Sequence, residues 1–155
     1  MSSQRTLTPS AVPRGLWVVA GSGLLPFLTC LALLRADDAL AARAVQAFIV
    51  YAALTLSFLG GARWGAELVR QPDAPVVTRL AASAVPSVVG LAALLPSVSA
   101  TAALLLLMAC GVGQLVWDVG ASRAGLLPAW NARVRTVMTL GGTLCTAAML
   151  ILKPV

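Results

Sequence analysis

The stretch SFLGGARWGAELVRQPD, residues 57–73, closes the second long apolar segment of the chain and decides how the rest is interpreted. Within a few helical turns it holds small residues, a tryptophan, an arginine and a glutamate. Arg63 and Glu67 are four residues apart, so they can pair along one helix. Charges at membrane depth are costly and normally face protein or water. The stretch therefore predicts a membrane helix whose end gathers charge.

The same stretch carries a second pattern of small residues. Ser57, Gly61 and Gly65 fall at four-residue steps and so share one helix face. Small side chains on one face let a neighbouring membrane helix approach closely. We therefore predict that these three residues form a helix-packing face.

The composition of the whole chain agrees with a membrane protein. Its 155 residues are 59% hydrophobic and only 10% charged, whereas soluble domains carry about 25% charged residues. Such a chain cannot cover itself with a polar surface. At about 20 apolar residues per span, the length allows five or six crossings.

The apolar runs predict an all-α integral membrane bundle of five transmembrane helices. A flexible polar N-terminus, residues 1–14, precedes a single domain, residues 15–155. Asp37 or Asp38 is expected to cap the second helix, and kinks are expected at Pro26 and Pro86. Residues 120–135 are expected to form a loop or an interfacial segment. The predicted helices lie at about 15–34, 40–68, 76–95, 99–119 and 134–152.

The basic residues predict the orientation of this bundle. With five crossings, eight arginines flank the N-terminal side and three basic residues flank the other side. The positive-inside rule then places the N-terminus in the cytoplasm, or in the matrix of a mitochondrion, and the C-terminus on the opposite side. The residues on the N-terminal side are Arg5, Arg14, Arg63, Arg70, Arg79, Arg123, Arg133 and Arg135.

Catalytic, cofactor and metal sites are not predicted. The chain has no histidine, and Cys30, Cys110 and Cys145 are isolated within apolar runs, where they are expected to pack as small residues. No basic run interleaved with aromatic residues indicates nucleic-acid binding. We therefore expect no cofactor, no nucleic-acid partner and no enzymatic activity.

Helix counting brings scattered polar residues into one membrane leaflet. The second and fourth helices end on the N-terminal side, where the third and fifth begin, and Arg79 and Trp117 share this level. Three hypotheses follow: a salt-bridge network in which Arg63 and Arg133 neutralise Glu67 and Asp118, a site for an anionic headgroup, or a small-molecule or proton pathway. The candidate cluster is Arg63, Trp64, Glu67, Gln114, Asp118, Trp130, Arg133 and Arg135.

Several stretches resemble the transmembrane protein 69-like family. They are SFLGGARWG at residues 57–65, Val85-Pro86-Ser87, Gly113-Gln114 with Asp118, and GLLPAW at residues 125–130 followed by Arg133. The resemblance implies a small multi-pass membrane protein without an established activity, found in bacteria and in eukaryotes with mitochondria. It implies no catalytic residues, and a histidine or an arginine at position 63. The arginine that this chain has at position 63 does not favour a proton relay at that position.

Three functions are weighed for such a chain. The leading hypothesis is a non-enzymatic accessory or assembly subunit of a larger complex in the bacterial inner membrane, or in the mitochondrial inner membrane. The alternative is a binding module for an anionic lipid or a quinone-like amphiphile, at Arg63, Trp64, Asp118, Trp130 and Arg133. The third is a small-solute transporter. Membrane lipids and other membrane-protein subunits are the expected partners.

Overall fold

The computed structural model describes residues 14–69 and 75–153, which form a bundle of helices. Five segments are long and apolar enough to cross a membrane, and the first of these comprises two short helices. The prediction of an all-α bundle of five spans is therefore confirmed. The helices are α1 (Arg14–Ser22), α2 (Leu25–Leu33), α3 (Asp38–Leu68), α4 (Val76–Ala93), α5 (Ala100–Arg123) and α6 (Ala129–Leu152).

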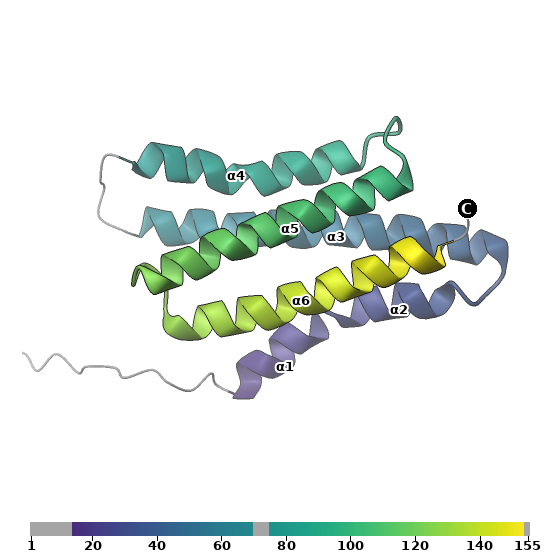
Figure 1. The fold of residues 1–155 in the computed structure, drawn as a ribbon, viewed down its shortest axis with the longest axis horizontal. Coiled ribbons are helices and arrows are strands. Elements are labelled where there is room, and N and C mark those ends of the chain that lie inside the picture. Colours follow the sequence, from purple (N-terminus) through teal and green to yellow (C-terminus); the bar gives the residue numbers. More distant parts are fainter. Residues whose placement is uncertain (1–13, 70–74, 154–155) are drawn as a thin grey trace, which may run out of the picture.

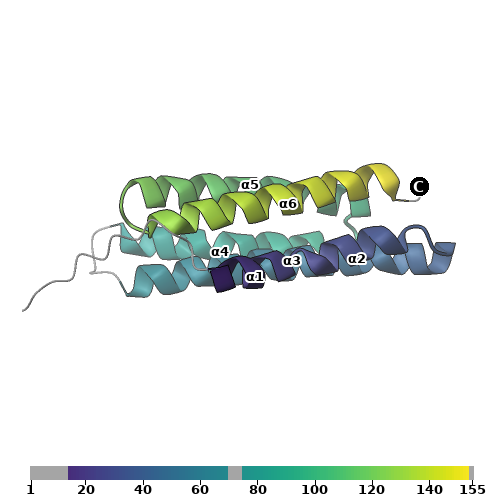
Figure 2. The same cartoon turned by 90° about the horizontal axis from the view of Figure 1, so that it is seen from below.

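The spans lie in two layers. Figure 2 shows α5 and α6 in one layer above α1, α2, α3 and α4 in the other. Figure 1 shows α5 lying over α3 and α4, while α6 packs against α5, α2 and α1. The ends of α3 and α5 and the starts of α4 and α6 meet at one end of the bundle (Figure 1), which we call the polar end. The predicted N-terminal tail lies outside the described residues except for Arg14, where α1 begins.

The first span is broken rather than kinked. The predicted kink at Pro26 becomes a turn at Gly23 and Leu24, and Pro26 lies in the first turn of α2. Proline has no N–H group and its ring clashes with the carbonyl four residues earlier, so it is favoured at a helix start and disfavoured in a helix interior. The break therefore falls before Pro26. On the N-terminal side of the break, α1 lies at an angle to the axis of α2 (Figure 1).

Side-chain caps define the starts of α3 and α5. The Asp37 carboxylate accepts a hydrogen bond of 2.9 Å from the backbone N–H of Leu40, which confirms one of the two predicted caps. The Ser99 hydroxyl accepts one of 3.2 Å from the N–H of Ala102. Each bond satisfies one of the N–H groups that a helix start leaves without a partner. With 31 residues, α3 is about 46 Å long and extends beyond the hydrocarbon core.

The prediction of a loop at residues 120–135 is wrong for most of that segment. Helix α5 continues to Arg123, and α6 begins at Ala129, five residues before the predicted start. Gly125 has a φ of 71°, which a glycine adopts without steric cost. Pro128 precedes the first residue of α6, and its ring fixes a backbone angle suited to that boundary.

Helices α3 and α4 approach most closely at two glycines. A Cβ atom at Gly60 would lie 2.6 Å from the backbone oxygen of Ser83, and one at Gly90 would lie 3.2 Å from that of Ala53. Helix α4 runs on through Pro86, which lies against Gly60. This contact lies one residue away from Gly61, and no described atom lies within 4 Å of a Cβ placed on Gly61 or Gly65. The packing face of Ser57, Gly61 and Gly65 stays a prediction.

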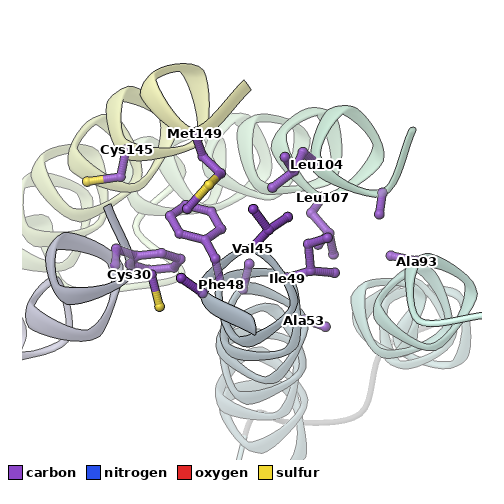
Figure 3. Close-up of a cluster of buried hydrophobic side chains, with 14 of the residues drawn as sticks. Cys30, Val45, Phe48, Ile49, Ala53, Ala93, Leu104, Leu107, Cys145 and Met149 are labelled. Atoms are coloured by element: carbon purple, nitrogen blue, oxygen red, sulfur yellow. The ribbon is translucent and has the colours of Figure 1, made fainter. Parts of the chain in front are cut away.

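The apolar core lies toward the other end of the bundle, between α2, α3, α5 and α6. Figure 3 shows Phe48 of α3 among Cys30, Leu104, Cys145 and Met149. Phe48, Leu104 and Met149 are fully buried. The prediction that the cysteines pack as small residues is confirmed, since Cys30 and Cys145 belong to this core and Cys110 packs against it.

Candidate functional site

A chain of ion pairs crosses the polar end of the bundle. Glu67 lies between two arginines, with Arg63 Nη2 at 2.9 Å from Oε1 and Arg79 Nε at 2.7 Å from Oε2. Asp118 Oδ1 lies 3.9 Å from Arg63 Nη1, and its Oδ2 lies 2.6 Å from Arg135 Nη2. Arg135 Nε also donates a hydrogen bond of 2.7 Å to Oδ2. These five residues, the ion-pair chain, join α3, α4, α5 and α6.

The three inner members of this chain are buried in protein. Arg63, Glu67 and Asp118 are only 4%, 1% and 4% exposed. A buried charge is tolerated when oppositely charged groups and hydrogen bonds surround it, and removing one partner is strongly destabilising. The predicted pairing of Arg63 with Glu67 is confirmed, and so is the gathering of these charges at one end. The geometry fixes the register of four helices.

The partner of Asp118 from α6 differs from the prediction. Arg135 makes this ion pair, while Arg133 lies on the exposed surface. Two helical residues that are two positions apart point about 200° away from each other. Only one of these two arginines can therefore face the bundle, and in the rotation that α6 adopts it is Arg135.

Among the tryptophans, the one that contacts the ion-pair chain is Trp117. The Arg63 guanidinium carbon lies 4.6 Å from the centroid of the Trp117 ring, within the range of a cation–π interaction. Trp64 is 41% exposed, and Trp130 is half-buried near the start of α6. The headgroup site at Arg63, Trp64, Asp118, Trp130 and Arg133 stays a prediction, of which Arg63 and Asp118 belong to the ion-pair chain.

Gln114 lies one helical turn from Asp118 on α5. It is 5% exposed, and neither atom of its amide has a hydrogen-bond partner among the described residues. Nε and Nη1 of Arg63 and Oδ1 of Asp118 likewise lack a hydrogen bond there. This group mixes donors and acceptors, a combination that suits bound water better than an anion.

A cavity lies beside the ion-pair chain and was not predicted. Its volume is about 520 Å³, and its walls come from α1, α2, α3, α5 and α6. The walls are mainly apolar, and Arg135 is the one charged residue among the described residues that line them. Arg135 therefore belongs both to the ion-pair chain and to the cavity.

One face of α6 forms the polar side of this cavity. Arg135, Thr139, Thr143 and Thr146 all line it, at spacings of three or four residues that place them on one helix face. From Arg135 to Thr146 this face extends about 16 Å along the helix. The hydroxyl of Thr146 donates a hydrogen bond of 2.8 Å to the carbonyl of Gly142. The hydroxyls of Thr139 and Thr143 make no hydrogen bond among the described residues.

The break in the first span explains why the cavity exists. At the break, the Tyr51 hydroxyl of α3 donates a hydrogen bond of 2.9 Å to the carbonyl of Gly23. Leu24 packs tightly on α6, where a Cβ atom at Gly141 would lie 2.8 Å from its Cδ1. These contacts hold the break between α3 and α6. Beyond it α1 packs against α6 and leaves the space beside α3 partly open.

The open side of the cavity faces the membrane. Val19 of α1 and Leu54 and Phe58 of α3 line the cavity and are also 70%, 61% and 73% exposed. Apolar side chains that are exposed on a membrane span contact lipid chains. The cavity can therefore be reached sideways from the bilayer. The threonine spacing on α6 and the proline in the first span are the sequence signals that point to it.

Comparisons with known proteins give a family and one relative. The family described as protein of unknown function (DUF3429) matches residues 12–151. Transmembrane protein 69 of Xenopus tropicalis is 31% identical over 121 residues, which are 77% of this chain and 47% of that protein. The chain thus spans about half the length of the curated relative that it matches. No solved structure matches it significantly.

Proposed function

This chain belongs to the DUF3429 family of multi-pass membrane proteins, and from its structure we propose that it binds a membrane amphiphile rather than catalysing a reaction. The observation that carries the proposal is the cavity of about 520 Å³ with Arg135 at its polar end. Binding pockets typically have volumes of about 300 to 1,000 Å³ and mostly apolar walls with a few placed polar groups. The cavity meets each of these criteria.

The position of the polar groups supports an amphiphile over a wholly apolar molecule. The ion-pair chain lies at the end of the bundle, where a headgroup resides, and beyond Arg135 the described lining residues are uncharged and mainly apolar. A molecule with a polar head and a hydrocarbon tail matches this order. Arg135 is held in place by Asp118, so the head would meet a guanidinium that is already oriented.

Native mass spectrometry tests the proposal. The protein would be transferred from native membranes into nanodiscs and then released, and the mass of each chain would show any retained lipid. Gly142 lines the cavity and no described atom lies within 4 Å of its Cβ position, so Gly142→Leu extends a side chain from a position with open space and is expected to reduce the volume of the cavity. Gly113→Leu is the matched control, because Gly113 also has open space but lies outside the cavity.

We expect one amphiphile per chain in the parent protein and in Gly113→Leu, and its loss in Gly142→Leu. A parent protein without any retained amphiphile would overturn the proposal. Equal retention by all three proteins would overturn it too, because the molecule would then be bound elsewhere. Circular dichroism and size-exclusion elution of each variant verify that the bundle is folded.

An accessory role in a larger complex is the second candidate function. The observation that favours it is the face of Gly61 and Gly65 on α3, which no described atom of the chain covers. Such a face permits close approach of a helix from another subunit. Gly61→Ile and Gly65→Ile together would then remove a copurifying subunit from gently solubilised membranes. Purification of the parent protein without any subunit would exclude this role.

We place the protein in the bacterial inner membrane, or in the mitochondrial inner membrane for a eukaryotic source, with the N-terminus on the cytoplasmic or matrix side. The charge bias supports this orientation, since Arg63, Arg79, Arg123, Arg133 and Arg135 share the polar end while Arg35, Arg43 and Lys153 lie toward the other. Reporter fusions at each terminus test it. Activity of a periplasmic reporter at the N-terminus would reverse the assignment.

A further inference from the structure

We propose that the cavity binds an acidic amphiphile with a single hydrocarbon chain, with its headgroup on Arg135 and Thr139. The inference rests on the proposed function, because it specifies which amphiphile the cavity holds. Three features of the described residues support it: the volume of the cavity, the charge of its lining, and the hydroxyl groups along α6.

The volume favours one chain over two. At about 30 Å³ for each group the size of a water molecule, a cavity of about 520 Å³ holds on the order of 17 methylene-sized groups. The polar face of α6 extends about 16 Å, close to the roughly 15 Å that separates a headgroup from the middle of a bilayer. A single chain of that reach, together with its headgroup, can therefore occupy the cavity. A diacyl lipid would have to leave its second chain in the bilayer.

The charge of the lining favours an acidic headgroup. Arg135 is the charged residue among the described lining residues, and no carboxylate lies among them. Asp118 contacts the Nε and Nη2 atoms of Arg135 through Oδ2. The guanidinium carries five N–H donors, so those on Nη1 remain for another acceptor. A phosphate or carboxylate group matches this arrangement, because hydrogen bonds between ionised groups are about twice as strong as neutral ones.

The hydroxyl of Thr139 extends the headgroup site by one turn. Thr136 and Thr146 donate their hydroxyls to the carbonyls of Ala132 and Gly142, at 2.8 Å in both cases. Thr139 lines the cavity and makes no hydrogen bond of this kind among the described residues. Its hydroxyl can therefore donate to an oxygen of the ligand next to Arg135.

The headgroup must supply most of the selectivity. The tail moves from lipid into an apolar cavity, and since lipid chains are about as apolar as leucine, this transfer contributes little free energy. The contacts of Arg135 and Thr139 are made only when the headgroup is in place. The affinity of the cavity for a lipid should therefore depend strongly on the charge of the headgroup. The number of chains should matter only through how well they fit the cavity.

A competition experiment separates these two variables. The competitors are oleoyl lysophosphatidate, dioleoyl phosphatidate and oleoyl lysophosphatidylcholine, titrated in detergent against the delipidated parent protein. The first two share a headgroup and differ in chain number, while the first and third share a chain and differ in headgroup charge. Native mass spectrometry measures the bound fraction of each lipid, and Gly142→Leu and Gly113→Leu serve as the cavity and control variants.

We expect lysophosphatidate to bind at least tenfold more tightly than lysophosphatidylcholine, and measurably more tightly than phosphatidate, in each case only when the cavity is open. Equal binding of phosphatidate would overturn the single-chain inference, and equal binding of lysophosphatidylcholine would overturn the acidic headgroup. In both cases the proposed function survives, because binding still depends on the cavity. Absence of cavity-dependent binding by all three lipids would overturn the inference and the proposed function together.

The variant Arg135→Gln gives a second test of whether the cavity selects lipids by the charge of the headgroup. This variant should lose the preference for lysophosphatidate over lysophosphatidylcholine and keep cavity-dependent binding of the oleoyl chain. Since Arg135 also pairs with Asp118, the variant tests the inference only if its circular dichroism matches that of the parent. The comparison of the three lipids on the parent protein does not depend on it.

Discussion

Helix α3 is packed closely on one side and openly on another. Toward α4, Gly60 and Gly90 bring the backbones together so closely that a Cβ at Gly60 would lie 2.6 Å from a backbone oxygen. Toward α1, the same helix lines a cavity of about 520 Å³. Proteins are close-packed throughout most of their interior. The open side of α3 is therefore the exception, and a binding function explains it. The close packing of α3 against α4 stabilises the bundle despite the cavity.

The ion-pair chain links these two sides. It begins on α4 with Arg79, crosses α3 and α5, and ends on α6 with Arg135, which lines the cavity. A rigid frame around a partly open site holds binding groups in place before the ligand arrives. We infer that stability resides on the α3–α4 side and binding on the α1–α6 side. Each prediction below tests whether stability and binding are divided between these two sides.

The largest expected effect is on stability, from Glu67→Gln. Glu67 is 1% exposed and lies between Arg63 and Arg79, so its loss removes the short ion pairs of both arginines and leaves Arg63 with Asp118 at 3.9 Å. We expect the free energy of unfolding to fall by about 3–5 kcal/mol, as measured by SDS titration of the purified protein. Asp38→Asn, at an exposed position in the first turn of α3, should cost less than about 1 kcal/mol. Equal effects of the two variants would contradict the role assigned to the ion-pair chain.

The next prediction compares two leucines. Leu104 is fully buried in the core, whereas Leu59 is half-buried and lines the cavity. In a membrane the transfer term is small, so Leu104→Ala should cost about 1–3 kcal/mol through lost contacts. Leu59→Ala enlarges a space that already exists and should cost less than about 1 kcal/mol. If Leu59→Ala proved the more destabilising in the same titration, the cavity side would not be the loosely packed side.

A third prediction tests the close approach of α3 to α4. Gly60→Ala places a Cβ against the backbone of Ser83 and should cost about 1–3 kcal/mol. Gly61→Ala, one residue further, meets no described atom within 4 Å and should change stability by less than about 0.5 kcal/mol. Thermal unfolding followed by circular dichroism distinguishes them. A neutral Gly60→Ala would show that the two helices can separate without loss of stability.

Local patterns explain why much of the fold was predictable. Apolar runs of membrane length predict the spans. The four-residue spacing of Arg63 and Glu67 predicts their ion pair, and Asp37 before an apolar run predicts a helix cap. Each depends on residues within one or two helical turns. The gathering of charge at one end follows from alternating helix directions, which the number of spans determines.

The cavity and the partner of Asp118 were not predictable in the same way. The cavity depends on where the first span breaks and on Leu24 packing against Gly141, which is a contact between distant parts of the chain. The partner of Asp118 depends on the rotation of α6. That rotation is set by how α6 packs against α5 and α2, and it decides whether Arg133 or Arg135 faces inward. Sequence spacing gives a helix face but not the direction in which it points.

The smallest expected effect is on binding, from Thr139→Val. This change removes a hydroxyl from the cavity wall and keeps the branched shape of the side chain. Loss of one hydrogen bond of about 0.5–1.5 kcal/mol should weaken lysophosphatidate binding about two- to tenfold, with the free energy of unfolding unchanged. Thr101→Val, at an exposed position of α5 outside the cavity, is the control. Unchanged affinity in Thr139→Val, measured by native mass spectrometry, would restrict the headgroup site to Arg135. A change in stability without a change in affinity would instead place Thr139 on the structural side of the division.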